Sequence, residues 1–295
     1  MSKKIAFYHC HTPLHIGSGT TLDVIDLPIQ REAHTDYPVM PSTAIKGVIR
    51  AEYGLKESNF TPEEFPEKLE DCKKEKTICK EFFEIFGDGD QEGDIIFTDG
   101  KILLFPVKSV KGVFAWITCP LVLKRFSRDI GLDNFGEIDI KKDEAIAIGD
   151  KITIGNGNKK YVVLEELSFK VKNNNENSDV IENIHKNLPQ DLQKDIEKEK
   201  IIILSDDNFK YFVKNHTEVN ARTRIDQTTG TVKTGSLWYE ELVPAETVFY
   251  NAIFSRTEKE KNLNKVKNFI DKKVFQFGGD ETLGRGFTKV YIKEG

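Results

Sequence analysis

The sequence predicts an α+β fold on three observations. Lys4 to His11 alternates between two sets of side chains, which is a strand pattern. Residues 95–123 are the most apolar part of the chain and are punctuated by Asp99-Gly100 and Lys111-Gly112, as expected of a set of core strands. Val274 to Ile292 contains two more alternating segments. Helical patterns lie between these β segments, which together indicate a sheet core with helices between its strands.

Size and composition are those of an ordinary globular protein. The chain has 295 residues, of which 38% are hydrophobic and 31% charged, and this is enough to bury a large core. By length alone the chain could form one elaborated domain or two small ones. No run of apolar residues is long enough for a membrane span, and the amino terminus lacks a secretory signal. The four cysteines have no metal-ligand spacing, so reduced thiols and a cytoplasmic location are expected.

The charge is unevenly distributed. The formal net charge is −5, which argues weakly against a nucleic-acid partner. Residues 60–100, however, carry 13 acidic residues against 5 lysines, a local charge of −8 that leaves +3 on the rest of the chain. The rest of the chain can therefore form a basic groove, and the net charge does not exclude RNA.

Residues 9–50 hold the densest chemistry. They contain four of the six histidines, a Gly17-Ser18-Gly19 turn and one acid, Asp26, deep in an apolar run. The two glycines permit positive φ and a close approach to a ligand, although a plain turn fits equally well. An acid among apolar neighbours is costly unless it has a partner or a task. Asp26 is therefore the first candidate functional residue.

Two metal sites must be weighed on spacing. The histidines around Cys10 could bind zinc, but on a strand Cys10 points away from the face that His9 and His11 share. Residues 88–99 approach the spacing of a calcium-binding EF-hand loop, but a strand-like segment follows where that motif needs a helix. Hydrogen-bonded scaffold histidines and a polar loop are the favoured interpretations.

One predicted helix has a basic face. Ser42 is its expected N-cap, Thr43 to Tyr53 its body, and Gly54 its end. Lys46 and Arg50 are four residues apart and so lie on one face. A helix N-terminus with nearby cations suits a phosphate, but a capped surface helix fits the pattern equally well.

The middle of the chain carries an insertion and further elements. Residues 56–94 are expected to be an acidic, partly helical insertion. Asp143 to Glu166 has a β pattern, and its Gly155-Asn-Gly-Asn turn is weak as a phosphate cradle because no Lys-Ser/Thr pair follows. Asp179 to Lys200 has the charged helical pattern of a solvated face, and Ile201 to Leu204 that of a short buried strand.

Residues 215–243 predict a long β-hairpin. Its strands flank a turn at Gln227 to Gly230, with Arg222 and Arg224 on one strand face and Ile225 on the other. A two-stranded hairpin has too little core to be stable alone. It either packs on the body or grips a partner, and arginines opposite apolar residues fit a finger that contacts a phosphate backbone and wedges between bases.

A glycine-rich loop lies between the last two predicted strands. It contains Gly278, Gly279, Gly284, Arg285 and Gly286 within nine residues, more glycines than a turn requires. Successive exposed N–H groups in such a loop can form an anion-binding nest, to which the arginine adds a fixed charge. A hairpin loop without a ligand is the alternative.

These motifs, in this order, resemble the RAMP superfamily of CRISPR RNA-binding proteins, and within it the backbone subunits of type III-B (Cmr) effector complexes. The resemblance rests on TPLHIGSG, VIDLPIQRE, PSTAIKGVIR, the block over residues 86–120, SLWYEELVP and the glycine-rich loop. It covers nearly the full length and is weakest over residues 56–80 and 170–200. It implies a single domain over residues 1–295, with a ferredoxin-like (RRM-type) antiparallel-sheet core and insertions, from which the hairpin projects as a thumb.

The resemblance also implies a function. Members of the family repeat along a guide CRISPR RNA as a helical filament, together with other Cmr subunits. The thumb passes through the guide–target duplex, and the single-stranded target RNA is cleaved beside the displaced nucleotide. By resemblance the cleaving acid is Asp26, the loop histidine is His15, and the acidic pair after the thumb is Glu240 and Glu241. The helix from Ser42 is expected to face guide phosphates.

Two mechanisms stay open for Asp26. It could hold a hydrated Mg²⁺ or another divalent cation, or it could accept the 2′-OH proton directly. His15 could donate a proton to the leaving 5′-oxygen or only orient the phosphate. We favour a metal-dependent endoribonuclease with the metal at Asp26. The rival functions are a non-catalytic RNA-binding scaffold subunit and a stand-alone metal hydrolase, although no HExxH-like spacing is present.

Overall fold

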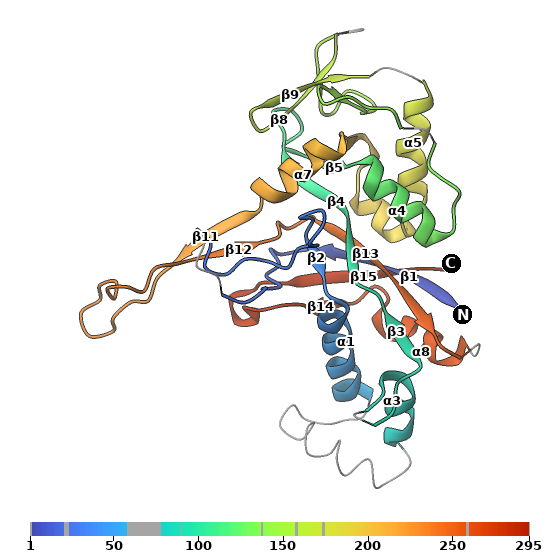
Figure 1. The fold of residues 1–295 in the computed structure, drawn as a ribbon, viewed down its shortest axis with the longest axis vertical. Helices are drawn as coiled ribbons and strands as arrows, with labels where there is room; N and C mark the ends of the chain where they lie inside the picture. Colours follow the sequence, from blue (N-terminus) through green and yellow to red (C-terminus); the bar gives the residue numbers. More distant parts are fainter. Residues whose placement is uncertain are drawn as a thin grey trace.

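In the computed structural model, β1 (Lys3–Cys10) lies at the centre of the main sheet (Figure 1). Its side chains are buried on both faces from Ile5 onward. It pairs antiparallel with β13 (Val248–Ser255) on one side and with β15 (Phe287–Glu294) on the other. The structure describes residues 2–20, 24–57, 78–88, 90–136, 138–156, 159–172, 175–257 and 260–294.

Six further strands complete the main sheet. They are β2 (Val39–Met40), β3 (Ile95–Phe97), β4 (Gly100–Lys108), β5 (Phe114–Thr118), β10 (Ile201–Ile203) and β14 (Val274–Gln276). The strand order is β10-β5-β4-β13-β1-β15-β14, with β2 paired to β4 and β3 to β13. The β10–β5 pair is parallel and the others are antiparallel, so the sheet is mixed and the predicted α+β class is confirmed.

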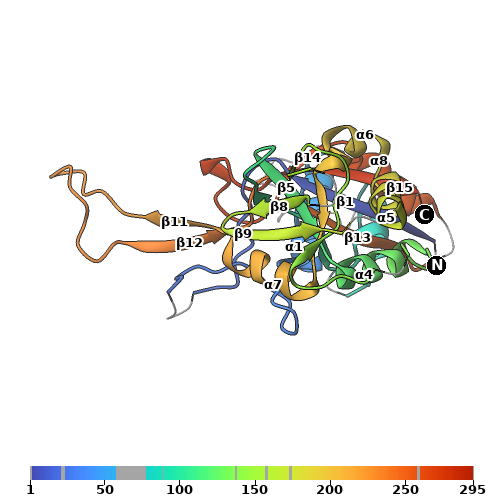
Figure 2. The ribbon, with the colours of Figure 1, turned by 90° about the horizontal axis from the view of Figure 1, so that it is seen from above.

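Two smaller β structures lie outside the main sheet. One contains β6 (Glu144–Ala145), β7 (Thr153–Ile154), β8 (Tyr161–Leu164) and β9 (Leu167–Val171), in the order β6-β9-β8-β7. The other is the predicted hairpin, formed by β11 (Glu218–Arg222) and β12 (Trp238–Leu242). The chain that joins β11 to β12 projects away from the body in both views (Figures 1 and 2). It turns where the sequence predicts, since the Asp226 N–H donates to the Thr231 carbonyl at 2.8 Å.

The helices contact different strands of the main sheet. The described ones are α1 (Ser42–Glu57), α3 (Ile78–Phe86), α4 (Pro120–Ile130), α5 (Asn175–Lys186), α6 (Gln190–Asp195), α7 (Asp206–Asn215) and α8 (Glu260–Ile270), with short 3-10 turns η1 (Lys198–Lys200) and η2 (Glu281–Leu283). α8 contacts β13, β15 and β1, and α1 contacts β3 and β14. In the upper part of Figure 1 lie the four-stranded sheet and α5, with α4 below α5. None of these helices has the length and apolar content needed to cross a membrane.

Several predicted boundaries are wrong. Residues 120–123 were expected in a strand but begin α4, because Pro120 occupies the first helical turn, where its missing N–H costs nothing. α1 starts at Ser42 itself and continues past Gly54, which is buried rather than helix-ending. The predicted solvated helix over 179–200 is α5, α6 and η1, which bury an apolar stripe. α7 and α8 were not predicted.

The acidic insertion is described only in part. Residues 58–77 and 89 lie outside the described ranges. The amphipathic end of the insertion forms α3, with Phe82, Ile85 and Phe86 buried. The polar loop that follows leads into β3, as the sequence predicts.

Candidate active site

One edge of β12 anchors both Asp26 and His15. The Tyr239 N–H donates to Asp26 Oδ2 at 2.7 Å, and the Leu27 N–H donates to the Tyr239 carbonyl at 3.1 Å. The Glu241 N–H donates to the Leu27 carbonyl at 3.0 Å, and His15 Nδ1 lies 2.7 Å from the Glu241 carbonyl oxygen. The two side chains are thus fixed at positions two residues apart on one strand, about 7 Å along it.

The hydrogen bond at Nδ1 determines which nitrogen of His15 is free. A carbonyl oxygen only accepts, so Nδ1 carries the hydrogen and Nε2 is the free nitrogen of the neutral ring. Nε2 lies 3.9 Å from Glu240 Oε1. A methyl group at Gly17 would lie 2.7 Å from Nε2, so the glycine in this turn makes room for the imidazole. The buried neutral ring therefore presents Nε2 as an acceptor, and Nε2 can donate a proton only when the ring is protonated on both nitrogens.

Asp26 has a partner and a free oxygen. It is half-buried, and Oδ2 is the oxygen that accepts the Tyr239 N–H. Among the described residues, no hydrogen bond to Oδ1 is present, so Oδ1 can meet a proton, a water or a cation. The segment is held beside the glycine turn, since the Gln30 N–H donates to the Ile16 carbonyl at 2.8 Å and the Ser18 N–H to the Pro28 carbonyl at 2.9 Å.

Glu241 is occupied within the protein. Its Oε1 accepts from Arg31 Nη2 at 2.5 Å and from Thr217 Oγ1 at 2.7 Å. Its Oε2 accepts the Ile29 N–H at 3.1 Å. The carboxylate is buried and joins β12 to the Asp26 segment and to the start of β11. The geometry therefore favours a structural role for Glu241 over the catalytic role implied by the family resemblance.

Glu240 belongs to a second ionic cluster. Arg222 Nη1 lies 2.9 Å from Glu240 Oε2 and 2.9 Å from Asp280 Oδ2. Burial raises the pKa of Glu240, and the hydrogen bond with Asp280 raises it further. Burial opposes ionisation of Asp280, but its hydrogen bonds to Glu240 and Arg222 together lower its pKa. The pKa of Glu240 is therefore raised while that of its neighbour Asp280 is lowered.

The two hairpin arginines differ. The Arg222 guanidinium is engaged by two carboxylates and also lies over the Trp238 ring, 5.6 Å from its centre. It is not the free phosphate-binding cation that the sequence predicts. Arg224 lies beyond the end of β11 and is exposed. Its contact with RNA stays a prediction.

Three of the glycine N–H groups that were expected to bind an anion have partners inside the protein. The Gly279 N–H donates to the His15 carbonyl at 2.9 Å, and the Gly286 N–H to the Pro13 carbonyl at 2.9 Å. The Gly284 N–H donates within the loop. These three N–H groups are used inside the protein, and two of them bind the loop to the segment that carries His15.

Only glycine fits at position 278 of the loop, beside the His15 backbone. Gly278 has φ of 78°, and a Cβ there would lie 2.1 Å from the His15 carbonyl oxygen.

Arg285 in the same loop makes no side-chain hydrogen bond or ion pair with another residue in the described ranges, so it can meet an anion.

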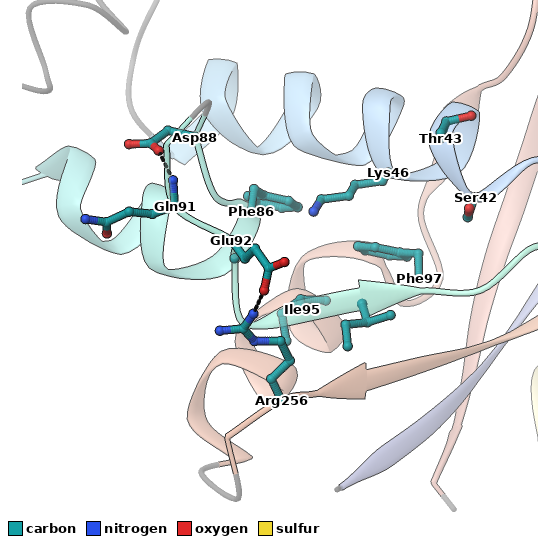
Figure 3. Close-up of a pocket in the computed structure, with 12 residues that line it drawn as sticks. Ser42, Thr43, Lys46, Phe86, Asp88, Gln91, Glu92, Ile95, Phe97 and Arg256 are labelled. Atoms are coloured by element: carbon teal, nitrogen blue, oxygen red, sulfur yellow. Dashed lines mark hydrogen bonds and ion pairs between the residues drawn. The ribbon is translucent and has the colours of Figure 1, made fainter.

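The α1 residues form a separate cluster. Ser42, Thr43 and Lys46 line a cavity of about 400 Å³ between α1 and the loop from α3 to β3. Figure 3 shows Lys46 extending from α1 into the space beside Phe86 and Phe97. Within the described part of the chain, Lys46 makes no hydrogen bond or ion pair. Burial and the neighbouring Arg50 charge lower its pKa.

A protein carboxylate caps α1. The Ser42 N–H donates to Asp99 Oδ1 at 2.7 Å, so Ser42 is not the N-cap that the sequence predicts. One of the N–H groups that a phosphate would use is therefore occupied. Arg50 lies over the Phe82 ring, 5.1 Å from its centre. Lys46 and Arg50 are left as the groups of this helix that can meet a phosphate.

The described part of the chain contains no ready-made metal cage. No group of three or more His, Cys, Asp or Glu side chains there is placed to hold a metal ion. His9 Nε2 lies 3.0 Å from Glu246 Oε2. The carboxylate of Asp94, from the EF-hand-like loop, accepts from Ser255 and Thr257. A cation at Asp26 would take a single carboxylate from these residues and its other ligands from RNA oxygens and water, a set that suits Mg²⁺.

Sequence reasoning missed two residues of the site. Arg31 neutralises Glu241, and Asp280 joins the glycine-rich loop to Arg222. An acid in a loop that was expected to bind anions was a signal for the second. No signal in the sequence pairs Arg31 with an acid 210 positions away.

This α+β protein holds an Asp and a His side by side on one strand edge at the base of a projecting hairpin, and a glycine-rich loop packs on the segment that carries the His. These features fit the RAMP class of RNA-binding proteins. The sequence model of the RAMP superfamily matches residues 7–289. The chain belongs to the RAMP superfamily, as its motifs predict.

Particular relatives lie within the Cmr4 group. The CRISPR system Cmr endoribonuclease Cmr4 of Pyrococcus furiosus is 40% identical over 294 residues, which cover 96% of this chain and 93% of that protein. The CRISPR system CMR subunit Cmr4 of Saccharolobus solfataricus is 23% identical over 320 residues, covering 96% and 94%. The fold matches the crystal structure of oligomeric Cmr4 from Pyrococcus furiosus with a TM-score of 0.76 and 32% identity, over 100% of this chain and 99% of that one.

A more distant structure shares the fold. A chain in the cryo-EM structure of the type III-B Cmr-beta complex bound to cognate target RNA matches with a TM-score of 0.71 and 21% identity, over 99% of this chain and 97% of that one.

Proposed function

We propose that this protein is the guide-RNA-binding backbone subunit of a type III-B CRISPR effector complex, and that it cleaves complementary target RNA. The observation that carries the proposal is the 40% identity to a Cmr endoribonuclease over 96% of the chain. The anchoring of Asp26 and His15 on one strand edge supports a catalytic rather than a purely scaffolding subunit.

The architecture that supports this function is a ferredoxin-like core in a single domain. The chain order β1-α1-β3/β4-β13-α8-β15 follows the βαββαβ pattern. The sheet order β4-β13-β1-β15 places the first and third strands in the centre. Residues 56–94 are then an insertion, and residues 215–243 a thumb that enters the guide–target duplex and displaces a nucleotide.

The displaced nucleotide supplies the nucleophile. Its 2′-OH attacks the adjacent phosphorus in line, and the P–O bond to the 5′-oxygen of the next nucleotide breaks. Positioning alone lowers such a barrier by several kcal/mol, of order 7 in favourable cases. Asp26 Oδ1 takes the 2′-OH proton, directly or through water, and His15, in its doubly protonated form, gives the Nε2 proton to the leaving oxygen. A separation of about 7 Å between their anchor points leaves room for a phosphate between them.

Mg²⁺ or another divalent cation fits beside Asp26. The free Oδ1 would hold the cation, as the alternative to accepting the 2′-OH proton directly. A bound cation would stabilise the negative charge that develops on the phosphate oxygens and lower the pKa of the groups it coordinates. The other ligands of the cation would be RNA oxygens and water.

Binding of the guide is assigned to other residues. Lys46 and Arg50 on α1, Arg285 in the glycine-rich loop and Arg224 on the hairpin carry the positive charge that remains available. Copies of the subunit, stacked along the guide in the cytoplasm with other Cmr subunits, would repeat these contacts.

The test is Asp26→Asn in the assembled complex with Mg²⁺ and a labelled target. The amide oxygen can still accept the Tyr239 N–H, so assembly and target binding should be unchanged while cleavage is abolished. The wild-type complex should give a regular ladder of products. Intact target with the wild-type complex would favour the non-catalytic scaffold, and normal cutting by the variant would remove Asp26 from the mechanism.

A further inference from the structure

Three segments meet at one guanidinium beside His15. Arg222 comes from β11, Glu240 from β12, and Asp280 from the glycine-rich loop, and Arg222 Nη1 lies 2.9 Å from each carboxylate. The other oxygen of Glu240 lies 3.9 Å from His15 Nε2. The loop is therefore joined to the imidazole through three contacts in series, from Asp280 to Arg222, from Arg222 to Glu240, and from Glu240 to His15.

Asp280 has an unusual backbone for this contact. It has φ of 59° and ψ of 35°, the left-handed region that side chains other than glycine rarely adopt. Its carbonyl accepts the Leu283 N–H at 3.0 Å and the Arg285 N–H at 3.3 Å, which hold the conformation. The next residue, Glu281, is exposed, whereas the Asp280 side chain is turned inward and 20% exposed. Backbone strain of this kind persists where the surroundings require it, and often at functional sites.

We propose that Asp280 is a positioning residue for RNA cleavage, which fixes Glu240 against His15 through the shared Arg222. This inference rests on the proposed function. Nothing in the motif resemblance assigns Asp280, whose side chain contacts neither His15 nor Asp26 directly.

The charges of the cluster explain why a second acid is useful. The charged groups that act on Glu240 are Asp280, His15 and Arg222. Two carboxylates close together do not both ionise readily, and one proton is shared between them. Whenever Glu240 holds that proton, one anion balances one guanidinium, and His15 Nε2 faces a neutral carboxyl group. The imidazole then remains available to the RNA instead of being held by a full ion pair at Glu240.

Replacing Asp280 should alter both the geometry and the charge. In Asp280→Asn the negative neighbour is lost and the amide can donate to Glu240, so both causes that Asp280 contributes to the raised pKa of Glu240 disappear. Glu240 then loses its proton at lower pH. Asn is the non-glycine residue best tolerated in the left-handed region together with Asp, so the loop should keep its shape.

The experiment measures single-turnover cleavage of a labelled target by the assembled complex over a range of pH. We expect Asp280→Asn to cut about ten- to a hundred-fold more slowly, as misplacing a catalytic group by about 1 Å does. The basic limb of its pH profile, on which Glu240 loses its proton, should move to lower pH. The matched control is Glu281→Gln, which removes the same charge from the same loop, where the side chain is exposed and has no partner among the described residues.

Three outcomes would overturn the inference. They are Asp280→Asn cutting as fast as Glu281→Gln, a slower rate with an unmoved pH profile, and a loss explained by weaker assembly or target binding. Arg222→Gln provides a second variant, since the double variant should lose little more than the larger single variant if both act through one contact. Failure of the proposed function is distinct, because the wild-type complex would then leave the target intact.

Discussion

Around β12 the charged side chains are paired inside the protein, whereas Lys46 and Arg50 on α1 have no ion pair with any residue that the structure describes. Glu241 is met by Arg31, and Glu240 and Asp280 share Arg222. Lys46, on the wall of the 400 Å³ cavity, has no ion pair among the residues that the structure describes (Figure 3). The charges around β12 are therefore neutralised within the protein, and the positive charge on α1 is available to a ligand.

The difference separates two tasks. Groups that are fixed by neighbours before the substrate arrives need no reorganisation during the reaction, which is the arrangement that catalysis favours. Cations without internal partners exchange counterions for phosphates, which gives affinity that depends on salt rather than on a defined geometry. Substitutions near β12 should therefore change stability or rate, and substitutions on α1 should change binding.

The largest effect is expected at Glu241. In Glu241→Gln the charge of Arg31 loses its counterion while both side chains are mostly buried, at 4% and 18% exposed. Removing one partner of a buried pair typically costs several kcal/mol, so the free energy of unfolding should fall by about 3 kcal/mol. Denaturant unfolding of the purified chain measures it.

A double-mutant cycle provides the control for that prediction. Arg31→Gln should cost a similar amount, and the double variant should cost clearly less than the two losses added together. Additive losses would show that the two side chains do not interact, and the description of β12 as internally paired would fail.

The second prediction concerns the space that Gly17 leaves for His15. Gly17→Ala places a methyl group 2.7 Å from Nε2, so the ring must move and its hydrogen bond to β12 weakens. Target cleavage should fall about ten-fold, which corresponds to about 1.4 kcal/mol, with target binding unchanged. Gly279→Ala approaches the same ring at an ordinary 3.7 Å from Cδ2 and should cost much less. Equal losses would mean that the ring position is not what matters.

The sequence predicted the parts of the fold whose signals are local. Alternation over Lys4 to His11 identified β1, and the hairpin was placed together with its turn. α7 and α8 were missed because their apolar faces are short. The Pro120 error has a similar origin, since an apolar run has no period until a neighbouring element shows which face is buried.

The site was predicted as a set of residues but not as a set of contacts. Asp26 was identified because an acid among apolar residues needs a reason, yet its partner is a backbone N–H in residue 239. The glycine-rich loop was recognised as unusual, but its predicted anion-binding role did not anticipate its hydrogen bonds to the segment that carries His15. Its N–H groups serve Pro13 and His15, and only long-range pairing reveals this. Contacts between positions far apart in the chain carry no local pattern.

The smallest effect is expected on α1, where the comparison predicts binding without chemistry. Lys46→Ala removes one cation that has no described partner, so guide RNA affinity should fall about five-fold, or about 1 kcal/mol. The slope of log K against log salt should become shallower by about 0.7, the value for one contact with a single strand. Lys124→Ala on α4, an exposed lysine without an ion pair among the described residues, controls for net charge. Unchanged affinity in Lys46→Ala, or the same loss in both variants, would place the guide elsewhere, because only a direct phosphate contact removes affinity and salt dependence together.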